Sequence, residues 1–139
     1  MHFLSNLITI ISNANAAKLN SVSCKISTRN ELNYIFQILT ILQKEGIIRG
    51  FSYIKKRRSN KKATHIIIIY LKYNEQGNNV IKSIFIVSKS SRPVYIKTAT
   101  FWQPQTSSGF FLISTKYGII TDTIARQYNL GGYILFGIT

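Results

Sequence analysis

The apolar positions near the start of the chain follow a helical and then a strand-like spacing. Apolar residues at positions 4, 7, 8 and 11 have the i, i+3, i+4, i+7 spacing of one helix face. This predicts a short amphipathic helix that packs on a sheet and ends near Asn13 and Asn15. The short alternating segment Ser21–Ile26 predicts a strand.

A capping motif predicts the start of a second helix. Thr28 and Glu31 have the Ser/Thr-x-x-Glu spacing at which a hydroxyl and a carboxylate satisfy each other's free backbone amides. Apolar residues then recur at helical spacing at positions 32, 35, 36, 39 and 42. Gly46 follows and can supply the left-handed residue that closes a helix. We therefore expect a helix between Thr28 and Gly46.

The following segments predict a β-hairpin with a strongly basic tip. Ile47–Ile54 and Thr64–Tyr73 have strand character. Six cations occupy eight positions between them: Lys55, Lys56, Arg57, Arg58, Lys61 and Lys62. The turn-rich residues 75–79 leave two possibilities open, a boundary between lobes or a second hairpin turn before a strand at Val80–Val87.

Three short strands and one short helix are expected in the last third of the chain. The predicted strands are Val94–Ile96, Phe110–Ile113 and Tyr133–Ile138. The polar segment 88–93 and the segment 103–109 connect them. Thr121 can cap a helix that runs to Tyr128, and the paired glycines 131 and 132 are favoured as its C-terminal cap.

Composition favours a folded, basic protein. The 139 residues are 45% apolar, which suits one compact protein of one or two small lobes. Eighteen Lys and Arg against four Asp and Glu give a formal net charge of +14. Each cation docked on a phosphate releases a counterion, so the charge predicts a nucleic acid as partner, with an anionic membrane as the second possibility. So few carboxylates weigh against paired-carboxylate hydrolases and against hard-cation sites.

Other classes of protein lack support in the sequence. Cys24 is the single cysteine, which excludes an internal disulfide and a cysteine-rich zinc module. The first 13 residues lack the pattern of a cleaved signal, and the longest apolar run, 66–71, is far short of the roughly 20 residues that span a bilayer. His2 and His65 have no catalytic partners in sequence, and no nucleophile elbow or phosphate loop occurs. We expect no enzyme activity, no cofactor, no metal and no small-molecule substrate.

Two segments are candidates for contact with nucleic acid. Like charges at the density of the basic tip repel one another, which favours neutralisation by a polyanion over an inert solvated loop. The hydroxyl-rich loop that follows Ile113 offers small side chains, exposed amides and the Tyr117 ring to a nucleotide. From the residues alone, an ordinary turn is favoured there, as a helix cap is favoured for the paired glycines.

The C-terminal run Ser114–Asp122, with Ala125–Gln127 and the glycines 131 and 132 after it, resembles the signature of a ribosomal family. That family is the eighth protein of the small ribosomal subunit. Three upstream segments match it in the same order: Ile11–Ala14, Glu45–Ile48 and Leu71–Tyr73. The resemblance therefore covers nearly the whole chain.

This resemblance implies an α+β fold of two small lobes, each a short β-sheet packed with one or two helices. Residues 1–78 would form an N-terminal lobe with the basic hairpin tip, and residues 79–139 an RNA-binding lobe. The protein would bind small-subunit ribosomal RNA directly, support subunit assembly and translation, and contact neighbouring ribosomal proteins. The implied RNA contacts are Ser114, Thr115, Lys116, Tyr117, Gly118, Gly131 and Gly132. To these we add the six cations of the basic tip and Arg92.

Several positions depart from the family pattern. The family loop usually has the order Ser-Thr-Ser-Lys-Gly, whereas Lys116 and Tyr117 stand at its third and fourth positions here, so stacking can replace a phosphate contact. Tyr133 replaces the glutamate that commonly follows the paired glycines. This drift, with the frequent Ile, Asn, Lys and Tyr of AT-rich coding, favours a mitochondrial protein over a plastid or bacterial cytoplasmic one. The alternative function is a non-ribosomal RNA-binding module that uses the basic tip, and a more distant one is a cationic peripheral membrane protein.

Overall fold

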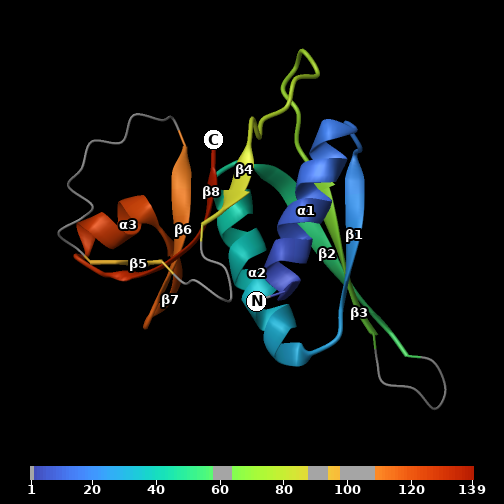
Figure 1. Cartoon of the computed structure of the whole chain (residues 1–139). Helices are drawn as coiled ribbons and strands as arrows, with labels where there is room; N and C mark the ends of the chain where they lie inside the picture. The colour runs from blue at the N-terminus through green and yellow to red at the C-terminus, as the bar shows by residue number, and fades with distance from the viewer. Residues whose placement is uncertain (1, 58–63, 88–93, 98–108) are drawn as a thin grey trace. The chain divides into compact units, whose positions relative to one another are not determined.

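The computed structural model describes residues 2–57, 64–87, 94–97 and 109–139 (Figure 1). Its first elements are α1 (His2–Ala16), β1 (Ser21–Ile26), α2 (Arg29–Lys44), β2 (Ile48–Lys56) and β3 (Thr64–Leu71). The later elements are β4 (Ile84–Ile86), β5 (Tyr95–Ile96), β6 (Phe110–Thr115), β7 (Gly118–Thr121), α3 (Asp122–Gln127) and β8 (Gly132–Ile138). Phe3–Val80 form one compact unit, and Ile81–Thr139 form the main part of the other. The predicted α+β fold of two lobes is confirmed.

The first unit is an antiparallel sheet of order β1-β3-β2 with α1 and α2 against one face (Figure 1). Burial along β3 alternates, with Ile67, Ile69 and Leu71 facing the helices. This alternation is expected of a strand whose side chains point to opposite faces. β2 and β3 form the predicted hairpin, and Lys56 pairs with Thr64 at its end.

Local hydrogen bonds explain the bounds of α2. The Thr28 hydroxyl accepts a bond from the Glu31 amide at 3.3 Å, which is the hydroxyl half of the predicted capping box. At the other end Gly46 has a φ of +76°. Its amide donates to the Gln43 carbonyl at 3.1 Å, and the Ile47 amide donates to the Leu42 carbonyl at 2.9 Å. These bonds form a Schellman motif, so the prediction that Gly46 closes this helix is confirmed.

The second unit is a sheet of order β4-β8-β6-β7, with β5 also paired to β8 and every pairing antiparallel. α3 packs on this sheet. Its buried Ala125 lies in a cluster with Ile113 of β6 and Ile134 of β8. The cluster fixes the helix beside the strands that form the candidate site.

Two strand predictions in this unit were incomplete. The strand expected over Val80–Val87 forms only over Ile84–Ile86. The amides of Lys82 and Ser83 instead donate to the Thr139 carbonyl at 2.8 and 3.2 Å. These amides are therefore not available for the hydrogen bonds that a longer β4 would need. The short strand β7 was not predicted, because the segment before Thr121 was interpreted as a loop.

The prediction that the paired glycines end the last helix was wrong. α3 ends at Gln127, and Asn129 takes the left-handed conformation with a φ of +53°. The Leu130 amide donates to the Ala125 carbonyl at 2.9 Å, which completes the same kind of cap as in α2. Asparagine adopts this conformation more readily than other residues with a side chain, so the glycines are left for another role.

Candidate nucleic-acid interface

The hairpin between β6 and β7 has a two-residue tip whose shape is set by Thr115. The Thr115 hydroxyl donates to the Gly118 carbonyl at 2.8 Å and accepts a bond from the Tyr117 amide at 3.2 Å. Gly118 has a φ of +117°, a conformation that favours glycine. Thr115 and Gly118 therefore act on the shape of the tip, and Lys116 and Tyr117 are the residues projected from it.

Both tip side chains are exposed and lie together. The Tyr117 side chain is 70% exposed, and the Lys116 ammonium nitrogen lies 5.1 Å from the centre of its ring. This distance is within the range of a cation–π contact. The tip thus combines a plane on which a base can stack with a charge that can pair with a phosphate.

α3 orients the chain that leads to the paired glycines. The Thr121 hydroxyl caps the helix by accepting from the Ile124 amide at 3.5 Å. The Asp122 carboxylate is 2% exposed and pairs with Arg126 one turn later, at 3.3 Å. Together with buried Ala125, these residues of the family signature hold the helix, and Asn129 then turns the chain toward β8.

Gly132 allows β8 to approach β6 closely. A Cβ atom at Gly132 would lie 2.4 Å from the Ser114 carbonyl oxygen and 2.9 Å from Ile113 Cγ2. Both distances are shorter than any relaxed contact, so a side chain here would push the strands apart. The glycine brings the start of β8 against Ser114, which pairs with the neighbouring Tyr133.

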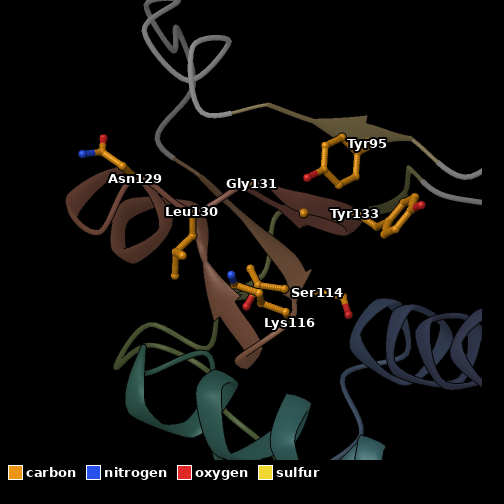
Figure 2. Close-up of a pocket in the computed structure, with 9 residues that line it drawn as sticks. Tyr95, Ser114, Lys116, Asn129, Leu130, Gly131 and Tyr133 are labelled. Atoms are coloured by element: carbon orange, nitrogen blue, oxygen red, sulfur yellow. The ribbon is translucent and has the colours of Figure 1, made fainter.

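The close approach leaves an open pocket of about 560 Å³ beside the hairpin tip (Figure 2). Its lining residues are Tyr95, Ser114, Thr115, Lys116, Asn129, Leu130, Gly131, Gly132 and Tyr133. Five of the seven residues implied by the family resemblance therefore line one pocket. Tyr117 lies in the adjoining tip, and Gly118 begins β7 beside it.

Two tyrosines stand at one end of this pocket, on neighbouring strands (Figure 2). The rings of Tyr95 and Tyr133 meet edge to face, with centres 5.1 Å apart and an interplanar angle of 76°. Their exposed fractions are 55% and 46%. Each ring is held by the other and still presents a surface to a ligand.

Four lining residues were not selected from the sequence as RNA contacts: Tyr95, Asn129, Leu130 and Tyr133, of which Tyr133 was noted only as a departure from the family pattern. Tyr95 was placed on a strand but not at a site, because its pairing with Tyr133 across β5 and β8 is a long-range contact. Asn129 and Leu130 were missed because the glycines were taken as the helix cap. The tendency of asparagine to occupy left-handed turns was the local signal that could have found this turn.

The basic tip lies in the other unit. Lys55 and Lys56 end β2, Arg57 follows them, and all three side chains are exposed. Arg58, Lys61, Lys62 and Arg92 lie outside the described residues. The candidate contacts that the structure describes therefore lie in both units.

Two titratable groups of the first unit have a shifted pKa. Burial raises the pKa of the Cys24 thiol, which keeps it protonated and unreactive. Desolvation also raises the pKa of Tyr73, whose hydroxyl donates to the Leu19 carbonyl at 2.6 Å. Within the described ranges, no group of three or more His, Cys, Asp or Glu residues could hold a metal ion. None of the helices described is long and apolar enough to cross a membrane.

Comparison with known proteins gives a consistent result. The family model for ribosomal protein S8 matches residues 2–138. The small ribosomal subunit protein uS8 of Sinorhizobium medicae is 36% identical over 135 residues, which cover 97% of this chain and 95% of the relative. The proteins of the same name from Kosmotoga olearia and Agrobacterium fabrum are 35% and 34% identical, each over 135 residues. These matches cover 95% and 97% of this chain and 93% and 95% of the relatives.

Proposed function

This chain belongs to the ribosomal protein S8 family, and on that premise we propose that it is a structural constituent of the small ribosomal subunit. In this role it binds small-subunit ribosomal RNA directly, contacts neighbouring ribosomal proteins and supports assembly and translation. The observation that carries the proposal is the family match across residues 2–138. The pocket of the second unit supports it, because two separate segments of the family signature, Ser114–Lys116 and the glycines 131 and 132, meet there.

The pocket residues suit an irregular RNA helix with unpaired bases. Ser114 has a small side chain and the glycines have none, so a sugar or a phosphate can approach their backbone closely. Tyr95, Tyr117 and Tyr133 offer rings on which bases can stack, and Lys116 supplies a cation for the backbone. The site thus binds RNA through shape, stacking and charge.

This role requires no turnover. We propose that the protein is not an enzyme and acts by fixing the conformation of the RNA, without a cofactor or a small-molecule substrate. The described residues support this proposal, because the pocket is lined by hydroxyl, aromatic, amide and glycine groups with one leucine, one lysine and no carboxylate. General acid–base chemistry would need a group that titrates near neutral pH.

Sedimentation of a cell or organelle lysate on a sucrose gradient tests the function. We expect the protein to migrate with the small subunit, to remain there after a high-salt wash and to be released by RNase. Migration as a free protein that still binds RNA would overturn the ribosomal role and favour the stand-alone RNA-binding module.

We further propose that the subunit is the mitochondrial one. The departures at Lys116, Tyr117 and Tyr133 and the AT-rich residue usage support an organellar protein, although the relatives compared above are bacterial. Fractionation with matrix, plastid and cytosolic markers tests this, and we expect the protein in the mitochondrial matrix fraction. Recovery with plastid or cytosolic ribosomes would overturn the location and leave the function intact.

A further inference from the structure

An aromatic pair lies at the hairpin end of the first unit, on the sheet face that α2 covers. Tyr53 of β2 and His65 of β3 stack with ring centres 5.7 Å apart and an interplanar angle of 24°. The Tyr53 hydroxyl and His65 Nδ1 are hydrogen-bonded at 2.5 Å. They are diagonal neighbours in the register, because His65 pairs with Lys55 and Tyr53 pairs with Ile67.

This pair is supported from the helix side and remains open. The ring of Phe36 on α2 meets Tyr53 edge to face at 5.6 Å, and Phe36 in turn packs on Phe51 at 5.8 Å. Tyr53 is nevertheless 40% exposed, and His65 is half-buried. The rings are thus held in a fixed orientation at the surface. Because they are already ordered, binding a ligand costs less side-chain conformational entropy.

Cations adjoin the two rings. Lys55 lies on the same face of the sheet, opposite His65, and Arg57 follows at the end of β2 with an exposed side chain. The sequences of β2 and β3 contain no Asp or Glu. An aromatic surface beside cations, on two strands without a carboxylate, fits a ligand with flat rings and negative charge.

We propose that Tyr53 and His65 form a stacking platform for unpaired bases of a single-stranded RNA segment, with Lys55 and Arg57 on its phosphates. The segment belongs to the small-subunit RNA, so the inference rests on the proposed function. Stacking on aromatic side chains combined with backbone cations is how proteins hold single strands without reading sequence. A protein partner would gain less from these rings and cations, because it offers no regular series of flat bases and phosphates.

The test is binding of the full chain to a fluorescent ten-nucleotide oligouridylate, measured over a series of KCl concentrations. The salt series separates the contribution of base stacking from that of the phosphate contacts. Replacing Tyr53 with leucine removes stacking only, so we expect affinity to fall about 5- to 150-fold at every salt concentration, with an unchanged slope. Y53F keeps the ring and is expected to retain most of the affinity. Replacing Lys55 and Arg57 with glutamine is expected to reduce the slope by about 0.7 for each phosphate that is no longer neutralised.

A charge-matched control uses two exposed lysines of the same unit. Lys18→Gln with Lys72→Gln removes the same net charge away from the rings. We expect this double variant to bind oligouridylate with nearly the wild-type slope. An equal reduction of the slope in both double variants would show diffuse electrostatic binding and overturn the proposal.

Ultraviolet crosslinking of the wild-type protein to the same oligonucleotide keeps the test valid if Y53L fails to fold. We expect a nucleotide adduct on the peptide that carries Tyr53 or His65, and adducts confined to other peptides would overturn the platform.

Co-sedimentation with the subunit, with neither a crosslink nor an effect of Y53L, would reject this inference and leave the proposed function intact. Crosslinking at Tyr53 without co-sedimentation would reject the ribosomal role. Loss of Y53L from the subunit with unchanged RNA binding would identify a protein contact and overturn the platform.

Discussion

Gly132 is the residue at which the backbone of β8 comes closest to β6. A methyl group there would lie 2.4 Å from the Ser114 carbonyl oxygen, and backbone atoms cannot move aside as a side chain can. We expect Gly132→Ala to lower the free energy of unfolding by about 1–3 kcal/mol, the usual cost of overpacking. Chemical denaturation followed by circular dichroism measures this change. The same variant should bind ribosomal RNA more weakly, because the strands that form the pocket are displaced.

Gly50 provides the matched control for this substitution. A Cβ atom there would meet only the side-chain amide nitrogen of Gln43, at an ordinary 3.7 Å. We expect Gly50→Ala to leave stability nearly unchanged or to raise it slightly, since alanine restricts the unfolded chain. Equal destabilisation by the two substitutions would contradict the close approach at Gly132.

Tyr117 and Tyr128 allow a second comparison of single residues. Both side chains are 70% exposed, but Tyr117 stands on the hairpin tip beside the pocket, and Tyr128 caps α3. If Tyr117 stacks on a base, Tyr117→Ala should weaken binding to a structured small-subunit RNA fragment by about 1–3 kcal/mol. Tyr128→Ala should change it little. The measurement is a titration at constant salt, and an equal loss on random RNA would show that the tip is not a recognition element.

The helix α2 depends on its N-terminal cap as well as on its buried face. Thr28 satisfies the free amide of Glu31, whereas Thr40 lies inside the helix and its hydroxyl donates back to the Phe36 carbonyl at 2.7 Å. We expect Thr28→Ala to lower the free energy of unfolding by about 1 kcal/mol. Thr40→Ala should be neutral or slightly stabilising, because alanine has the higher helix propensity. Thermal or chemical unfolding compares them, and similar losses would mean that the cap contributes nothing.

The elements that sequence predicted well are those whose signals are local. The cap at Thr28, the left-handed Gly46 and the two hairpin strands β2 and β3 could each be recognised within a few residues. The end of α3 was placed wrongly although Asn129 gave a local signal, because the glycines at 131 and 132 give the same signal more strongly and only packing decides between them. β7 was missed for a similar reason, since a four-residue strand carries little pattern of its own.

The candidate site required both the family resemblance and the fold. Sequence order separates Tyr95, Ser114 and Tyr133, and only the pairing of β5 and β6 with β8 brings them to one pocket. The local pattern favoured an ordinary turn at Ser114–Gly118, and the resemblance reversed that judgement. No single-sequence pattern specifies which tyrosines converge, because strand register is a property of the folded sheet.

At the scale of the whole molecule, the net charge of +14 indicates that RNA binding neutralises many phosphates. Each phosphate that a Lys or Arg neutralises lowers the slope of log affinity against log salt concentration by about 0.7 to 0.9. The prediction is therefore a steep loss of affinity for ribosomal RNA as KCl rises, measured by filter binding or fluorescence anisotropy. An affinity that does not respond to salt would contradict it.

Variants of the two units should change this dependence in different ways. Charge reversal of Lys55, Lys56, Arg57 and Arg58 should make the slope shallower on any RNA, because phosphate contacts carry no sequence information. Replacing Tyr133 with alanine should lower affinity for the structured site at every salt concentration without changing the slope, because stacking releases no counterions. If the charge reversal abolishes all binding while the pocket variant has no effect, recognition lies in the first unit alone. In that case the close approach at Gly132 would not serve RNA binding.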